Sequence, residues 1–232
     1  MPLRKWIESA NHAIEGVLHA AKTERHMRYH FYAAILLFVI SFTIGVSWFE
    51  FVILITLSII VLSVEMLNSA VESITDILFK EYDLRAKQIK DMAAGAVLIT
   101  ALGAAIIGYI ILYEPLKNFF YSGLRIAKHN GSDVAVVALI VVLILVVLSK
   151  SFFGKGQPLR GGMPSGHSAV AFSMWVAVTF ISESFMASVL AVLMAVLIAQ
   201  SRISTGIHRP IEVILGGLLG AIVTFLLFKV FL

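Results

Sequence analysis

The chain has 232 residues, of which 59% are hydrophobic and only 14% are charged. Soluble domains carry about 25% charged residues, so this composition argues against a water-soluble globular protein. No cysteine is present, which excludes disulfides and thiolate metal sites and leaves the redox compartment undetermined. The net charge of +4 lies mostly between apolar runs. That pattern indicates membrane topology and contact with lipid headgroups, and it does not suggest binding to nucleic acid.

The N-terminal 30 residues are polar and basic, and they lack the central apolar stretch of a cleavable signal peptide. Their apolar residues recur at helical spacing: Trp6, Ile7, Ala10, Ile14, Leu18 and Ala21. This spacing predicts an amphipathic helix that lies on the membrane surface. The alternative is an ordinary cytosolic extension.

Seven apolar runs follow, and we interpret them as membrane-spanning helices. The expected spans are residues 31–48, 51–77, 92–113, 134–149, 168–181, 185–200 and 213–232. The runs are too long for the strands of a membrane barrel. The predicted fold class is therefore an all-α integral membrane protein with about seven transmembrane helices and an N-terminal amphipathic surface helix.

A polar break at residues 114–133 contains Pro, Asn, Gly and three basic residues, so we place a linker there. It separates a first domain, residues 1–113, from a second domain, residues 134–232. Basic residues crowd four segments, and the positive-inside rule places these in the cytoplasm: 4–28, 80–90, 150–160 and 202–209. The linker is the exception, because the parity of the spans places its basic residues outside.

One face of the second span carries four polar residues at spacings of 3, 4 and 4: Glu65, Asn68, Glu72 and Asp76. Three carboxylates on one stripe repel one another unless a cation neutralises them, and oxygen ligands favour Mg²⁺. Magnesium held by few carboxylates commonly also binds nucleotide phosphates. Glu24 can supply a further oxygen, and Lys90 is placed to meet phosphate. Spacing alone leaves a polar seam between helices or an ion pathway equally open.

The stretch from Val64 to Asp76, followed by Lys90-Asp91-Met92-Ala93, resembles the signature of prokaryotic diacylglycerol kinases and undecaprenol kinases. The resemblance covers residues 1–113, and Glu15-Gly16 and Glu24 also fit it. It implies a three-span, trimeric bacterial kinase that uses Mg²⁺ and ATP to phosphorylate a membrane lipid at the cytoplasmic face.

The resemblance also implies a role for each polar residue of this half. Glu65 would be the general base on the lipid hydroxyl. The other roles would be magnesium binding by Glu24, Asn68 and Glu72, and nucleotide binding by Lys90, Asp91 and Asp76. Phosphoryl transfer needs positioning and charge neutralisation more than covalent help, which suits such a set. Glycine-rich P-loop and protein-kinase signatures are absent, so the site must have another design.

The second half places cations, two histidines and a carboxylate at the ends of spans: Lys155, Arg160, Ser165, Gly166, His167, Arg202, His208 and Glu212. Cations and backbone N–H groups can bind the oxygens of a phosphate. One histidine can attack phosphorus while the other protonates the leaving alkoxide. Glu212 follows His208 by one helical turn and can hold its tautomer. The alternative is scattered interfacial charge with solvated loop histidines.

Pro164-Ser165-Gly166-His167, and Ser201-Arg202 followed by His208, resemble two sequence boxes of the type-2 phosphatidate phosphatase superfamily, over residues 134–232. The resemblance implies His208 as a nucleophile that forms a phosphohistidine, His167 as general acid, and no metal or other cofactor. Phosphate would be bound by Lys155, Arg160 and Arg202, with Ser165 and Gly166 offering N–H groups. Two positions depart from the family: Arg160 follows Lys155 after only four residues and lacks the next proline, and Glu212 replaces an aspartate.

Together the two resemblances imply a bifunctional membrane enzyme. One domain would phosphorylate diacylglycerol or undecaprenol, and the other would hydrolyse a lipid phosphate such as phosphatidate, phosphatidylglycerol phosphate or undecaprenyl phosphate. With a single shared lipid such a protein would consume ATP in a cycle, so we expect regulation or two different lipids. The alternatives are a chain with one active domain and a non-enzymatic lipid sensor or transporter. The preserved histidine pair argues against the latter, because transport needs no nucleophile.

Overall fold

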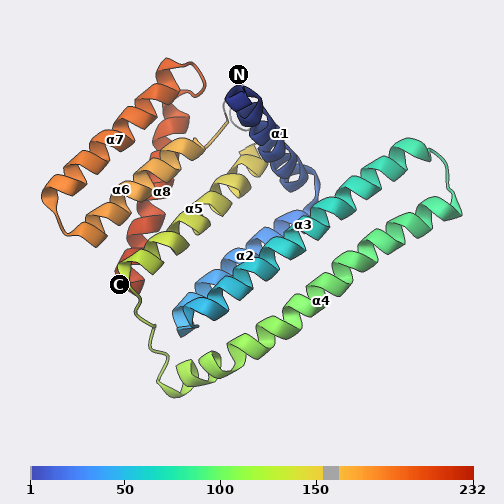
Figure 1. Ribbon diagram of the computed structural model, residues 1–232, viewed down its shortest axis with the longest axis horizontal. Coiled ribbons are helices and arrows are strands. Elements are labelled where there is room, and N and C mark those ends of the chain that lie inside the picture. The colour runs from blue at the N-terminus through green and yellow to red at the C-terminus, as the bar shows by residue number, and fades with distance from the viewer. Residues whose placement is uncertain (1, 154–161) are drawn as a thin grey trace. The chain divides into compact units, whose positions relative to one another are not determined.

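The computed structural model describes residues 2–153 and 162–232, and within them it contains eight helices and no strand (Figure 1). They are α1 (Pro2–Thr23), α2 (Arg25–Ile44), α3 (Trp48–Leu78), α4 (Leu84–Tyr121), α5 (Gly131–Phe153), α6 (Gly166–Ser182), α7 (Phe185–Ser204) and α8 (Pro210–Phe231). Six described helices are long and apolar enough to cross a membrane, and α6 is a shorter apolar helix of 17 residues. The predicted all-α membrane fold is therefore confirmed.

The structure corrects the predicted end of the third span. We expected it to end at residue 113, but α4 continues through Pro115 to Tyr121. Proline removes one helical hydrogen bond and favours a kink, yet the turns on either side can carry the helix on. The non-helical connection to α5 therefore shrinks to residues 122–130.

The chain divides into two compact units, one of residues 23–127 and one of residues 1–22 with 128–232. Helix α1 thus groups with the C-terminal helices, although its sequence lies in the first predicted domain. The cause is burial of its apolar face: Leu18 is 4% exposed and Ala21 is fully buried. The amphipathic pattern predicted a helix at the membrane surface, and in the structure part of its apolar face packs on protein.

The unit of residues 23–127 is built from α2, α3 and α4. An aromatic cluster joins the first two helices: the Phe51 ring of α3 lies 5.7 Å from that of Phe38 and 5.9 Å from that of Phe42. Helix α3 begins at a capping box, in which Ser47 and Glu50 bond each other's backbone N–H groups. At 1.5 Å per residue, α3 is about 46 Å long, whereas the hydrocarbon core is about 30 Å thick. Its polar second half therefore reaches the membrane boundary.

In the other unit, α6 and α8 pack at very close range. A Cβ atom added at Gly220 would lie 1.9 Å from the Ala169 carbonyl oxygen, and one at Gly216 would lie 2.3 Å from that of Ser165. Small residues four apart allow this approach between membrane helices. A buried hydrogen bond of 2.7 Å joins Ser173 to Thr224 farther along the pair. The packing sets the N-terminal end of α6 against the first turn of α8.

Two candidate active sites

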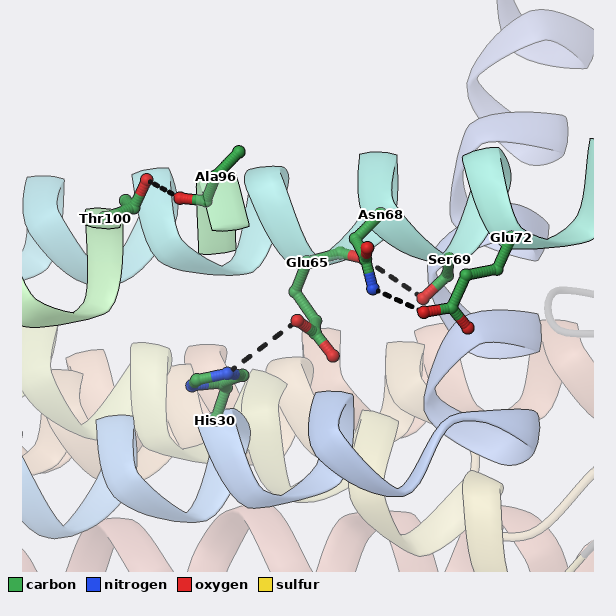
Figure 2. A network of polar contacts seen from close by, with 7 residues as sticks. All are labelled: His30, Glu65, Asn68, Ser69, Glu72, Ala96 and Thr100. Atoms are coloured by element: carbon green, nitrogen blue, oxygen red, sulfur yellow. Dashed lines mark hydrogen bonds and ion pairs between the residues drawn. The ribbon is translucent and has the colours of Figure 1, made fainter. Parts of the chain in front are cut away.

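A buried carboxylate lies at the centre of the first site (Figure 2). Glu65 is 4% exposed, and His30 of α2 points toward it, with Nε2 4.0 Å from Oε2. The Ser69 hydroxyl donates to the Glu65 backbone carbonyl at 3.0 Å, one turn farther along α3. Burying a charged group costs free energy unless a partner compensates it, and His30 is a basic group near the Glu65 carboxylate. A carboxylate so placed can accept a proton from a hydroxyl.

The next turn of α3 presents an unsatisfied oxygen. Asn68 Nδ2 donates to Glu72 Oε1 at 3.0 Å, which leaves Asn68 Oδ1 buried and without a hydrogen-bond partner among the described residues. An orphaned amide oxygen beside a carboxylate fits the preference of Mg²⁺ for oxygen ligands. No group of three His, Cys, Asp or Glu side chains converges as a metal cluster in the described chain. Glu24 occupies the N-cap position of α2, and its side chain makes no capping bond there.

The predicted nucleotide-binding residues lie where α3 ends and α4 begins. Lys90 of α4 forms an ion pair with Asp76 of α3, and the side chains of Asp76 and Asp91 are about two-thirds exposed. Asp83 caps α4 nearby and accepts hydrogen bonds from Arg85, which lowers the pKa of that carboxyl below its usual range. This end of the unit is therefore charged and accessible to a soluble ligand.

An apolar pocket of about 450 Å³ opens beside the His30 ring. Side chains from all three helices line it, among them Leu37 of α2, Leu57 and Val61 of α3, and Ala104 and Leu112 of α4. Such a lining matches a hydrocarbon chain and offers a hydrophilic ligand few partners.

The second site is built around a buried histidine. The His208 side chain is 1% exposed, and its Nδ1 lies 2.8 Å from Glu212 Oε2, one turn into α8. The same carboxylate oxygen accepts from the Arg209 backbone N–H at 3.3 Å, which holds it in place. With Nδ1 as the donor to Glu212, Nε2 carries the lone pair that a nucleophile needs.

A cationic side chain lies next to this pair. The His208 backbone N–H donates to the Arg202 carbonyl at 3.1 Å, which ties the start of α8 to the end of α7. Arg202 Nε is buried and has no hydrogen-bond partner among the described residues. Buried donors of this kind are rare in proteins, and a guanidinium suits the oxygens of a phosphate.

A pocket of about 490 Å³ contains both histidines. Its polar lining consists of Lys150, Gly166, His167 and His208, and the remainder is apolar. Ser165 is fully buried, and its backbone N–H donates to the Glu212 carbonyl at 2.9 Å. The binding of phosphate by the Ser165 N–H stays a prediction, and in the structure the packing of α6 on α8 uses that donor. Two predicted cations, Lys155 and Arg160, lie outside the described residues.

Comparison with known proteins identifies the first half of the chain. The family model for prokaryotic diacylglycerol kinases matches residues 11–112. The undecaprenol kinase of Bacillus subtilis (strain 168) is 34% identical over 114 residues, which cover 49% of this chain and 93% of that protein. The chain belongs to the prokaryotic diacylglycerol kinase family. The diacylglycerol kinase of Escherichia coli (strain K12) is also 34% identical, over 47% of this chain and 88% of that protein.

The kinase-family region is fused to a second one. Residues 149–232 match the PAP2 superfamily. The undecaprenyl-diphosphatase of Sulfolobus acidocaldarius is 32% identical over 79 residues, which cover 34% of this chain and 38% of that protein. No solved structure matches the chain. The chain therefore joins a region of the prokaryotic diacylglycerol kinase family to a region that is similar to the PAP2 superfamily, as the two resemblances implied.

Two residues of these regions escaped the sequence prediction. In the kinase-family region, His30 contacts the pocket and faces Glu65. In the PAP2 region, Lys150 is buried in the last turn of α5 and lines the histidine pocket. Basic residues at the ends of membrane helices usually extend to the interface, which is why neither stood out. A signal existed for Lys150, since the short spacing between Lys155 and Arg160 departs from the family pattern.

Proposed function

We propose that this protein is a bifunctional membrane enzyme that transfers phosphate from ATP to a lipid alcohol and removes phosphate from a lipid phosphate. The observation that carries the proposal is that the chain contains two groups of polar residues, each with a buried polar atom that has no hydrogen-bond partner among the described residues. Asn68 Oδ1 beside Glu72 is suited to a cation, and Arg202 Nε beside the His208–Glu212 pair is suited to a phosphate.

In the kinase reaction, Glu65 takes the proton of the lipid hydroxyl while that oxygen attacks the γ-phosphorus of ATP. The bond from the γ-phosphorus to the bridging oxygen breaks, and ADP leaves. Asn68 and Glu72, with Glu24, would hold Mg²⁺, which would supply positive charge to neutralise the phosphates. Lys90, Asp91 and Asp76 contact the nucleotide at the exposed end of α3 and α4.

The pocket beside His30 supports a lipid as the acceptor. Its apolar lining receives part of the hydrocarbon chain, so the hydroxyl end of the lipid lies toward His30 and Glu65. The names of the relatives make diacylglycerol and undecaprenol the two acceptors to test.

In the phosphatase reaction, His208 Nε2 attacks the phosphorus of a lipid phosphate, and His167 gives a proton to the departing lipid alkoxide. The nitrogen–phosphorus bond forms as the phosphorus–oxygen bond breaks, which leaves a phosphohistidine. Water then attacks the phosphohistidine while His167 takes a proton from that water, the nitrogen–phosphorus bond breaks and inorganic phosphate leaves, which restores both residues. Arg202 and Lys150 bind the phosphate oxygens, together with Arg160, Lys155 and the Gly166 N–H. No metal is assigned to this step.

The distribution of charge supports a location in a bacterial inner membrane, with both sites at the cytoplasmic face. The multi-pass helical fold is consistent with it. The kinase-family region is proposed to form a trimer, because three spans do not readily enclose an active site by themselves.

The kinase activity is tested by the transfer of label from γ-labelled ATP to diacylglycerol or undecaprenol by the purified full chain. We expect Glu65→Gln to lower lipid labelling by at least about 100-fold, as loss of a general base does. The control is Glu81→Gln, which removes an exposed loop carboxylate and should leave the rate unchanged. Equal rates in the Glu65→Gln variant and the wild type would refute the assigned base.

The phosphatase mechanism is tested by trapping the intermediate. Labelled phosphatidate is mixed with the full chain, and the reaction is stopped in alkali, in which a phosphohistidine survives. We expect label on the wild-type protein and none on His208→Asn, whereas His26→Asn, at an exposed histidine of α2, should retain it. Label that persists on His208→Asn would show that another residue is the nucleophile.

A further inference from the structure

The wall of the histidine pocket includes an element from outside the PAP2 region. Ile14 and Leu18 of α1 line this pocket together with Lys150, His167 and His208, although the PAP2 match begins only at residue 149. These two side chains are four residues apart and so share one face of α1. Helix α1 therefore contributes to a pocket whose chemistry belongs to the C-terminal region.

The placement of α1 rests on more than the pocket lining. Residues 1–22 and 128–232 form one compact unit, and within it Leu18 and Ala21 are buried. By contrast Ile14 is 41% exposed, so its side chain is open to an incoming ligand.

The lining of the pocket combines a few polar side chains with many apolar ones. Lys150, His167 and His208 suit a phosphate, whereas the side chains of Val147, Met174 and Ile198 offer only apolar contacts. A ligand that fills it must carry a charged head and a hydrocarbon chain. Ile14 and Leu18 belong to the apolar part, because neither side chain can pair with a phosphate.

We propose that α1 forms the chain-binding wall of the phosphatase site and that Ile14 and Leu18 determine its preference for long-chain lipid phosphates over short-chain ones. The inference rests on the proposed phosphatase function. A long chain gains affinity by leaving water for contact with these side chains, and a short chain does not extend along them. The N-terminal helix would thereby be a specificity element for a reaction catalysed at the other end of the chain.

The test compares two phosphatidates, one with oleoyl chains and one with hexanoyl chains, as substrates of the full-length protein in mixed micelles. We expect Ile14→Asn and Leu18→Asn to raise the KM for the long-chain substrate about tenfold, which corresponds to roughly two lost methylene contacts. The kcat for both substrates and the KM for the hexanoyl substrate should stay within about twofold of the wild-type values. A twofold change corresponds to less free energy than the burial of one methylene group contributes. The control is Ala13→Asn, which places the same side chain at an exposed position of α1.

Two outcomes would overturn the inference. An equal loss of kcat on both substrates would give α1 a purely structural role, and unchanged kinetics in Ile14→Asn, whose side chain is not needed for packing, would remove α1 from the site. A wild-type protein that hydrolyses neither phosphatidate would instead count against the proposed phosphatase function. Failure of that function is therefore distinguishable from failure of the inference.

Discussion

At the scale of single residues, the two sites follow one principle, which is that a buried polar atom without a partner marks the place of a ligand. Asn68 Oδ1 and Arg202 Nε are the buried side-chain polar atoms left unpaired in the described chain. One is an acceptor beside a carboxylate, and the other is a donor of the arginine whose carbonyl accepts the His208 backbone N–H. Their opposite character is consistent with a cation at the first site and an anion at the second.

A residue-scale prediction concerns Lys150, which lies in the histidine pocket although the sequence pattern favoured Lys155. Replacing it by Met keeps the length of the side chain and removes its charge. We expect Lys150→Met to lower phosphatase kcat/KM by about 10- to 100-fold, since a hydrogen bond to a charged group contributes roughly 1.5–3 kcal/mol. The measurement is the hydrolysis rate of phosphatidate.

The matched control for this prediction is Lys229→Met, which removes an exposed lysine from the far end of α8. Lys150→Arg keeps the charge and should recover part of the activity. If Lys150→Met and Lys229→Met hydrolyse the substrate equally well, Lys150 does not bind the phosphate.

The sequence could predict the groups of candidate residues that lie at fixed helical spacing from one another. Glu65, Asn68 and Glu72 share a face of α3, and Glu212 follows His208 by one turn, so secondary structure alone brings them together. Contacts between separate helices could not be predicted from the sequence. The approach of His30 to Glu65, and the use of the Ser165 N–H by the Glu212 carbonyl, depend on how separate helices pack.

At the scale of helices, α8 positions the phosphatase site by its packing on α6. Gly216 and Gly220 allow the two backbones to approach, and the same contact sets Ser165 against the first turn of α8. Because His167 lies in the first turn of α6 and Glu212 lies in the first turn of α8, a change in this packing moves both residues. The sequence showed apolar helices here but gave no indication of which pairs pack closely.

An element-scale prediction follows for Gly220. A methyl group added there meets the Ala169 carbonyl oxygen, so α6 and α8 must move apart. We expect Gly220→Ala to lower the melting temperature of the detergent-solubilised protein, at a cost of about 1–3 kcal/mol, the usual range for overpacking. Phosphatase activity should fall, and kinase activity should not change.

Gly103→Ala provides the comparison, because a Cβ atom at Gly103 in α4 would have no neighbour within 4 Å. Alanine is the better helix former, so this variant should be as stable as the wild type or slightly more stable. A Gly220→Ala protein with an unchanged melting temperature and full phosphatase activity would show that the close packing of α6 on α8 is not required.

At the scale of the whole molecule, two enzyme families share one membrane chain. The family matches cover residues 11–112 and 149–232, whereas the compact units divide the chain differently, since α1 groups with the C-terminal helices. Residues 11–22 thus belong by sequence to the kinase family and by packing to the phosphatase unit. Amphipathic spacing revealed the apolar face of α1 but not the surface that covers it, because lipid and protein bury such a face equally well.

The central claim is that both activities belong to this chain and depend on different residues. One reaction tests it directly: the purified protein receives ATP with one phosphorus isotope at the γ-position, an unlabelled lipid alcohol, and phosphatidate labelled with a second isotope. We predict that Glu65→Gln abolishes only the labelling of lipid from ATP and that His208→Asn abolishes only the release of phosphate from phosphatidate. The wild type should do both, and wild-type protein that shows neither activity, or a variant that loses both at once while still folded, would contradict the account.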